Sequence, residues 1–347
     1  MFLLLALSFP NYIKSSHLGV VLNTFQLFVS RECLNLEGLL IWLESQGDPP
    51  YSLLTHGEDL DGLVSAGIFL KLLEKVVNLK FSAPYWAIED RRRYDIVTDL
   101  PPPRGGCKLL IDHHPSNVEL GKKRAIKSFV QPNYPSTALL VWELLNEESD
   151  LNQLKPLVDL TSEVDSGKYD EGSIKFTVVI RKLFSSTGRG AALKKVVDEL
   201  ISEVPATGEE LLGLKTVFPF WQEIEKEERE FLSWIYSLPS KIDDGSDLAV
   251  IIHVGRGPGY LSPLIHYKLQ NIVDLETILR ISDDGRGRLS IRSRKGSKVS
   301  ALELATKLGG GGHERAAGAT IDPKDIELLE KILKRSGMRI MIIRKPH

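Results

Sequence analysis

Three short apolar runs, each followed by an acidic residue or a histidine, constrain the fold of this chain most. The runs and the polar residues that follow them are Tyr51–Thr55 with His56, Asp95–Thr98 with Asp99, and Lys108–Ile111 with Asp112-His113-His114. Short apolar runs bounded by turn residues are typical of buried strands, and an open parallel sheet places its site at the carboxyl ends of its strands. The sequence therefore predicts an α/β fold whose parallel sheet gathers these polar side chains at one edge.

Apolar periodicity along the rest of the chain indicates further elements and two domains. We expect helices over 62–77, 136–145, 154–164 and 323–334, and a long helical stretch over 209–236 interrupted near Pro219. Further strands are expected over 248–254, 275–281 and 289–291, with a turn at Asp283-Asp284-Gly285. The predicted organisation is an N-terminal extension (1–50), a metal-binding parallel-sheet domain (51–205), a helical linker (206–240) and a smaller mixed-sheet α/β domain (241–347).

Composition favours a soluble globular protein of a reducing compartment. Of the 347 residues, 42% are apolar and 26% are charged, as in ordinary globular domains. Two cysteines, Cys33 and Cys107, are too few for a disulfide framework, so we expect inert thiols and a cytoplasmic location. Met1–Leu7 is apolar but short and lacks basic residues, so a signal peptide is disfavoured and no membrane association is expected. Residues 1–45 carry no motif and are either an extension packed on the body or translated from an upstream start.

Charge is distributed unevenly along the chain. Residues 286–347 hold 15 Lys and Arg against 6 Asp and Glu, an excess of +9, although the whole chain has a net charge of −2. A basic C-terminal part beside an acidic remainder fits a polyanionic substrate brought to carboxylates that bind metal ions. A solvated basic surface is the alternative that charge alone leaves open.

The predicted N-terminal domain presents a set of candidate metal ligands. They are His56, Asp59, Asp61, Asp99, Asp112, His113, His114 and Asp165. Singly, such residues are more often helix caps, turn residues or hydrogen-bonding pairs. Together, they offer oxygen and imidazole donors without thiolate, which favours Mn²⁺ over structural zinc. Carboxylates from four separate segments are too many for one ion, so two ions are expected, and paired ions favour hydrolysis at phosphorus.

The C-terminal part carries candidate anion-binding residues. Arg292 follows a predicted strand, and its planar donors suit bidentate binding of a phosphate or a carboxylate. Gly309–Gly312 with His313 predicts a flexible glycine loop able to bring backbone N–H groups close to a phosphate, although a plain linker is the alternative. The small residues after it indicate close backbone packing. Ser136-Thr137 is expected to cap a helix, and Gly255–Gly259 to form a mobile loop whose role in holding substrate stays open.

Taken in order, these motifs resemble a known family. Asp59-Leu60-Asp61-Gly62, Asp99, Asp112-His113-His114 and Asp165 are similar to the four motifs of the DHH phosphoesterase family. Arg292-Ser293 and Gly310-Gly311-Gly312-His313, followed by Ala316-Ala317-Gly318, resemble its DHH-associated C-terminal domain. The resemblance spans roughly residues 51–335 and is nearest to the nanoRNase and oligoribonuclease branch and to archaeal RecJ-like nucleases.

The resemblance also implies a role for each matched position. One ion would be held by His56 and Asp59, the other by Asp61, His113 and Asp165, and Asp99 would bridge both. His114 would contact the scissile phosphate, and Asp112 would orient the histidines. The substrate would be bound by Arg292, Ser293, Gly310, Gly311, Gly312 and His313. Glu58 competes with His56 as a ligand, and Asp159 is a weaker rival to Asp165.

From this reading we expect an exonuclease that depends on two Mn²⁺ ions, with Mg²⁺ or Co²⁺ as alternatives. It would hydrolyse short single-stranded RNA or DNA from an end, through a hydroxide activated by the two ions. The alternatives are hydrolysis of a small nucleotide, such as 3′-phosphoadenosine 5′-phosphate or a cyclic dinucleotide, and a non-catalytic nucleic-acid scaffold. A homo-oligomer and a DNA-repair or replication partner stay open, as do strand polarity and substrate length.

Overall fold

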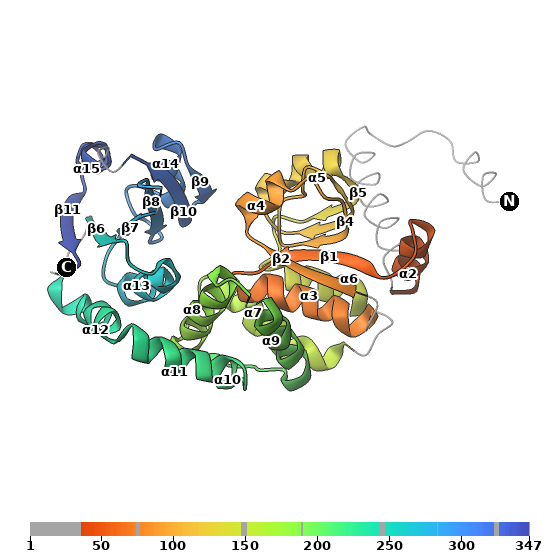
Figure 1. The fold of residues 1–347 in the computed structure, drawn as a ribbon. Helices are drawn as coiled ribbons and strands as arrows, with labels where there is room; N and C mark the ends of the chain where they lie inside the picture. Colours follow the sequence, from red (N-terminus) through yellow and green to blue (C-terminus); the bar gives the residue numbers. More distant parts are fainter. Residues whose placement is uncertain are drawn as a thin grey trace, which may run out of the picture. The chain divides into compact units, whose positions relative to one another are not determined.

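The computed structural model describes residues 36–73, 77–146, 151–188, 190–242, 247–282, 284–322 and 326–346. The chain divides into two compact units, one of residues 1–56 and 64–162 and the other of residues 57–63 and 163–347. Each unit is built around one β-sheet (Figure 1). Most of the predicted N-terminal extension, and Cys33 with it, lies outside the described residues. The domain boundaries predicted at 205 and 240 remain predictions.

The first unit is built on a five-stranded sheet in the order β2-β1-β3-β4-β5. Its strands are β1 (Tyr51–His56), β2 (Val77–Ser82), β3 (Tyr94–Thr98), β4 (Cys107–Asp112) and β5 (Ala125–Val130). Every neighbouring pair is parallel, which confirms the predicted parallel sheet. Strands β1, β3 and β4 are the three apolar runs of the sequence, because central parallel strands are buried on both faces. The β2 and β5 strands, which carry more polar residues, were not predicted.

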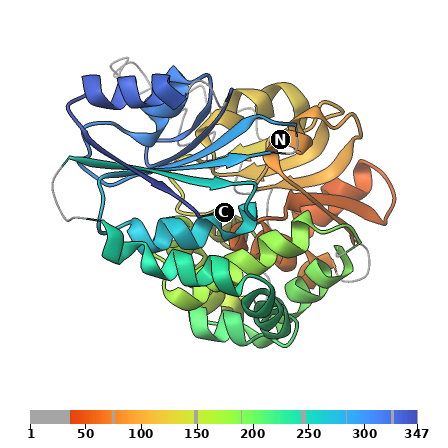
Figure 2. The same ribbon diagram turned by 60° about the vertical axis from the view of Figure 1, so that its left-hand side comes forward.

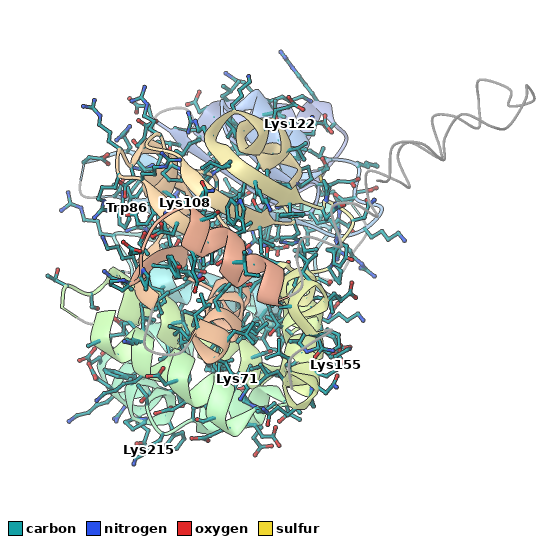
Figure 3. All side chains as sticks on the ribbon, turned by 90° about the vertical axis from the view of Figure 1, so that its right-hand side faces the viewer. Lys71, Trp86, Lys108, Lys122, Lys155 and Lys215 are labelled. Carbon is teal, nitrogen blue, oxygen red and sulfur yellow. The ribbon has the colours of Figure 1, made fainter. Side chains whose placement is uncertain are left out.

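Helices accompany this sheet along the chain. They are α2 (Leu36–Ser45), α3 (Leu60–Leu73), α4 (Pro84–Glu89), α5 (Val118–Arg124), α6 (Thr137–Leu145) and α7 (Lys155–Asp165). The predicted cap of α6 is confirmed, since the Ser136 hydroxyl accepts a hydrogen bond of 3.1 Å from the Leu139 N–H. On α4, Trp86 is 61% exposed (Figure 3). In the parts of the chain that the structure describes, no helix is both long and apolar enough to span a bilayer.

The core of the first unit explains the behaviour of its cysteine. Leu54, Val97 and Leu110 form a buried cluster that also contains Cys107. Burial raises the pKa of the Cys107 thiol to about 12. The thiol is the unreactive form of cysteine, so Cys107 is inert near neutral pH, as predicted.

The helices of the second unit differ most from the sequence-based expectation. They are α8 (Glu171–Ser185), α9 (Gly190–Glu203), α10 (Gly208–Gly213), α11 (Val217–Glu227), α12 (Arg229–Ser237), α13 (Ser262–Leu269), α14 (Ala301–Lys307) and α15 (Ile326–Arg335). The helical stretch predicted over 209–236 is present as the three helices α10, α11 and α12, with a break close to Pro219 and a second, unpredicted break at Glu228. Pro219 does not itself cause the first break, because it is the third residue of α11, where a residue needs no N–H for an intrahelical hydrogen bond. The α8 and α9 helices were not predicted.

The second sheet has six strands in the order β11-β6-β7-β8-β10-β9. Its strands are the teal and blue arrows in Figure 2. They are β6 (Leu248–Gly255), β7 (Leu275–Ile281), β8 (Gly287–Ser293), β9 (Gly311–His313), β10 (Ala316–Ile321) and β11 (Arg339–Arg344). The β11, β6 and β7 strands are mutually parallel, and β8, β10 and β9 pair antiparallel, which confirms the expected mixed sheet. Buried residues of α14 and α15, among them Leu304 and Leu329, complete its core.

The glycine run is not the flexible loop that the sequence predicted. Gly311–His313 forms β9 and pairs in register with Ala316–Gly318 of β10. A Cβ atom at Gly310 would lie 2.1 Å from the Gly318 carbonyl oxygen, and one at Gly312 would lie 2.6 Å from the Ala316 carbonyl oxygen. Glycine is needed here because two backbones approach closely, which is the packing that the small residues indicated.

Candidate metal centre

Asp99 adopts an unusual backbone conformation at the end of β3. Its φ is +53°, a left-handed value that is uncommon for any residue other than glycine. Its N–H donates to the Ile111 carbonyl oxygen over 3.1 Å, which ties the turn to β4. Such a conformation costs on the order of 1–3 kcal/mol and is found most often at functional sites. The carboxylate that it directs is almost fully buried.

Three imidazoles surround the Asp99 carboxylate. His56 Nδ1 lies 3.4 Å from Oδ2, and His114 Nδ1 and His113 Nε2 lie 3.5 and 4.0 Å from Oδ1. The Thr137 hydroxyl, at the start of α6, donates to Oδ1 over 3.2 Å. The three histidines come from the carboxyl ends of β1 and β4, so the parallel sheet gathers them as the sequence predicted.

The tautomer of His113 shows that this group suits a cation. His113 Nδ1 lies 3.1 Å from the Tyr134 carbonyl oxygen, and because a carbonyl can only accept, Nδ1 carries the proton. In the neutral form of the ring, Nε2 then carries the lone pair, and Nε2 lies 4.0 Å from Asp99 Oδ1. A lone pair and a carboxylate that face each other can both bind one divalent ion. In many metal sites, the other nitrogen of such a histidine donates to a carbonyl oxygen, as Nδ1 does here. This donor set therefore fits a metal ion.

Asp112 is engaged by its own neighbours. Its carboxylate accepts from the backbone N–H groups of His113 and His114 over 2.7 and 3.1 Å, and from the Asn117 side-chain amide. It also lies 2.8 Å from His114 Nδ1. Asp112 is fully buried, whereas the His114 ring is 29% exposed. The geometry is that of a carboxylate that orients an imidazole.

The predicted metal ligands come together in three groups whose ligand atoms lie within 4.8 Å of one another. The groups are Asp99 with His113 and His114, His56 with Asp59 and Asp99, and Asp61 with His113 and Asp165. Asp61 is the second residue of α3 and Asp165 the last of α7, two helices whose other residues belong largely to the first unit. Among the described residues, neither Glu58 nor Asp159 joins such a group.

Asp159 is occupied elsewhere. Its carboxylate forms an ion pair with Lys155 one turn earlier on α7 and is 56% exposed. An exposed pair of this kind is a common feature of helix surfaces. Asp159 therefore offers a matched control for the carboxylates of the candidate centre.

In the second unit, the register of the sheet aligns the predicted substrate-binding residues. Arg292 lies within β8 rather than after its end, opposite Ala316 of β10, and Ala316 lies opposite His313 of β9. Arg292 and His313 thus lie in one row across three strands. The Ser293 hydroxyl donates to the Glu314 carbonyl oxygen over 3.2 Å and accepts from the Ala301 N–H over 2.9 Å, so it holds the neighbouring turn.

Sequence reasoning missed the polar network behind Arg292. Glu276 of β7 pairs with Arg292 in the sheet, and its Oε1 lies 3.3 Å from His266 Nδ1. His266 Nε2 lies 2.8 Å from the Ser290 hydroxyl. Burial raises the pKa of Glu276 to about 8, although the charge of Arg292 opposes this. The available signal was a glutamate inside an otherwise apolar strand.

The raised pKa of Glu276 predicts a pH-dependent stability. A glutamate in the unfolded chain has a pKa of about 4.3, so folding favours the protonated form and is weakened as the pH rises toward 8. His266 has its pKa lowered by burial, and therefore weakens folding only below the pKa of about 6.5 of an unfolded histidine. Between pH 6.5 and 8, the change in stability therefore reports on Glu276 and not on His266.

We expect the free energy of unfolding of the Glu276→Gln variant to fall less than that of the parent chain between pH 6.5 and 8, by about 1–2 kcal/mol. Glutamine keeps the shape and the hydrogen-bonding capacity of a protonated glutamate and cannot ionise. Urea denaturation at pH 6.5, 7.2 and 8 measures the difference. Parallel pH profiles for the two proteins would show that Glu276 does not titrate in this range.

Comparison with known proteins gives a family match and a curated relative. Residues 249–336 match the DHHA1 domain model. The bifunctional oligoribonuclease and PAP phosphatase NrnA of Thermus thermophilus is 29% identical over 238 residues, which cover 67% of this chain and 64% of the relative. The chain thus matches somewhat less than two thirds of the length of that protein.

Solved structures share the fold. The pGpG-specific phosphodiesterase PggH of Vibrio cholerae superposes with a TM-score of 0.56 at 19% identity, over 83% of this chain and 99% of that one. RecJ of Thermus thermophilus, solved in complex with Mn²⁺, gives a TM-score of 0.55 at 18% identity, over 90% of this chain and 56% of that one. Residues 249–336 thus match a DHHA1 domain, and the chain as a whole is similar in sequence to NrnA and shares the fold of PggH and RecJ.

Proposed function

We propose that this protein is a divalent-metal-dependent phosphodiesterase that removes mononucleotides from the ends of short single strands. The observation that carries the proposal is the buried Asp99 carboxylate with three imidazoles around it. The relatives support the substrate class, since one is named an oligoribonuclease and another a phosphodiesterase specific for pGpG.

The proposed ligands follow two of the three groups of donor atoms. His56, Asp59 and Asp99 would hold one ion, and Asp61, His113 and Asp165 would hold a second, with Asp99 shared. Ions bound there would supply Lewis acidity and activate a water molecule. Mn²⁺ is our first choice because the donors are oxygen and imidazole, and because RecJ was solved with Mn²⁺.

His114 is the residue that we propose contacts the scissile phosphate. In its imidazolium form it donates one N–H from Nδ1 to Asp112, at 2.8 Å, and keeps the Nε2 proton for a phosphate oxygen. The buried Asp112 stabilises that charge and fixes the ring. A charge-assisted hydrogen bond of this kind stabilises the negative charge that develops on the phosphoryl group during attack.

The Arg292 row of the second sheet is proposed to bind the substrate. The Arg292 guanidinium remains charged even though burial lowers its pKa, so it can hold a phosphate or the end of a strand in two parallel hydrogen bonds. His313 and the backbone of β9, which are exposed, would contact the adjacent sugar.

We expect the purified protein with Mn²⁺ to release mononucleotides from short single-stranded oligonucleotides, and to degrade blunt duplex DNA poorly. Products from 5′-labelled and 3′-labelled strands, followed with time, give the polarity. Binding should weaken as salt increases, because each phosphate contact releases counterions. Cleavage of a circular single strand at a comparable rate would contradict an end-directed enzyme.

Hydrolysis of a small nucleotide is the second candidate, and one observation favours it: the NrnA relative is also named a PAP phosphatase. The same site chemistry would serve, because a terminal phosphate presents the same bond to the ions. Release of phosphate from 3′-phosphoadenosine 5′-phosphate, with oligonucleotides left intact, would assign the protein to this class. Repeating both assays with Mg²⁺ and Co²⁺ identifies the preferred ion.

A further inference from the structure

The second unit contains a pocket of about 970 Å³ at the far end of its sheet from Arg292. Arg292 pairs with Glu276 near the start of β7, whereas the pocket is lined by Leu279 and Ile281 at the end of that strand. At about 3.3 Å per residue, Glu276 and Ile281 are roughly 17 Å apart. The pocket is therefore separate from the proposed substrate-binding row, and its volume suits a small ligand.

Cations from three segments converge on this pocket. They are Lys226 and Arg229 from the junction of α11 and α12, Arg256 from the loop after β6, and Arg344 and Lys345 from the end of β11. Within the described parts of the chain, Lys226, Arg229, Arg256 and Arg344 have no recorded ion pair. Lys345 lies over the Phe231 ring, 5.1 Å from its centroid. Four unpaired cations around one hollow attract an anion.

The acidic side chains of the pocket do not cancel this charge. Glu227 is paired with Lys182, which does not line the pocket, at 2.5 Å. Glu228 accepts a hydrogen bond of 2.6 Å from the Tyr260 hydroxyl. Glu230 is the one remaining acidic residue in the lining. The pocket therefore presents a surplus of positive charge.

The floor of the pocket is apolar and firmly packed. A Cβ atom at Gly257 would lie 2.6 Å from the Phe231 ring, so glycine lets the loop after β6 lie against that ring. The Gly257 N–H donates to the Val254 carbonyl oxygen over 3.0 Å, which anchors a loop that was expected to be mobile. Phe231 is almost fully buried, so it belongs to the packed floor, and the cations supply the binding groups of the pocket.

His253 adds a polar group at the pocket wall. Its Nε2 atom is buried and has no hydrogen-bond partner within the described residues. Burial lowers the pKa of His253, and the charge of Arg344 lowers it further. A buried ring nitrogen without a partner costs free energy.

We propose that this pocket is a second binding site for a nucleotide phosphate, independent of the metal centre and of Arg292. The phosphate would lie among Arg229, Arg256 and Arg344, beside the first turn of α12, whose dipole favours an anion. The rest of the nucleotide would occupy the remaining volume of the pocket. A free mononucleotide and an internal phosphate of a longer strand offer the same chemistry.

The test is titration calorimetry on the full chain in a chelator, so that binding is measured without turnover. The ligands are adenosine 5′-monophosphate and a twelve-nucleotide single strand. The variant is Arg256→Glu with Arg344→Glu, two exposed residues with no recorded ion pair. The matched control is Lys195→Glu with Lys215→Glu, two exposed lysines of the second unit away from the pocket (Lys215, Figure 3). Circular dichroism confirms that both fold.

We expect the pocket variant to bind the nucleotide at least tenfold more weakly than the parent chain, and the control to bind within twofold of it. Arg292→Ala removes binding at its own row, so the binding that this variant keeps is the part to be assigned to the pocket. Affinity for adenosine 5′-monophosphate assigns the site to free nucleotides, whereas affinity for the strand alone assigns it to a backbone phosphate. The proposal is overturned if the parent binds neither ligand, if the control loses as much affinity as the pocket variant, or if only Arg292→Ala abolishes binding. Because no hydrolysis is measured, this result is independent of the proposed activity.

Discussion

Replacing Asp99 by Ala is expected to lower turnover by on the order of a thousandfold and to reduce the content of bound metal. The carboxylate lies among three imidazoles and is proposed to bind both ions. A ligand that contacts only one ion therefore cannot replace it. Hydrolysis of a labelled oligonucleotide measures turnover, and elemental analysis after gel filtration measures the metal.

Asp99→Asn and Asp159→Ala make this experiment specific. Asparagine has the shape of aspartate and tolerates the left-handed backbone conformation, so Asp99→Asn removes the charge with little added strain. Asp159→Ala removes a carboxylate of α7 that pairs with Lys155 on the surface, and should leave turnover unchanged. Near-normal turnover and metal content in Asp99→Asn would refute the shared carboxylate.

Replacing Arg292 by Ala is expected to weaken substrate capture by about 10- to 150-fold, because a charge-assisted hydrogen bond typically contributes about 1.5–3 kcal/mol. The loss should appear in KM, with metal content unchanged. Arg292→Lys should recover little of the lost substrate affinity, since an ammonium group cannot form two parallel hydrogen bonds to one phosphate. Steady-state kinetics on short oligonucleotides separates the effects on KM and kcat.

Arg288→Ala is the matched control, since Arg288 lies four residues earlier on the same strand and on the same face. It is exposed and contacts Asp284 and Thr320 instead. A change in KM as large for Arg288→Ala as for Arg292→Ala would indicate a general effect of positive charge. Loss of metal in Arg292→Ala would indicate that the row supports the ions rather than the substrate.

The parallel sheet and its polar edge could be predicted because central buried strands are nearly continuous apolar runs that end abruptly in ligands. The β5 strand was not predicted, since its lysine and its partly exposed residues hide the pattern. The α8 helix carries a usable signal that was overlooked: Asp170 and Ser173 form a capping box at its start. By contrast, no local signal marks the break between α11 and α12 at Glu228, which has neither glycine nor proline beside it.

The candidate centre was predictable in residue type but not in geometry. The motif order indicated which carboxylates and imidazoles would meet, because strand ends converge in any parallel sheet. The left-handed turn at Asp99 and the carbonyl of Tyr134 behind His113 depend on tertiary contacts that no local pattern encodes. The pairing of Glu276 with Arg292 depends on strand register, which is decided by the whole sheet.

The glycine hairpin also affects how the protein behaves in a crowded solution. Strand β9 is the last strand of its sheet, so one side of its backbone has no neighbouring strand. A long open edge recruits strands from other molecules and seeds aggregates, but a strand of three residues is too short to do so. The same short edge leaves peptide groups without a β-partner on that side, where a sugar or a phosphate can bond to them. Because β9 is short, its open edge does not promote self-association, and its backbone stays accessible to a small ligand.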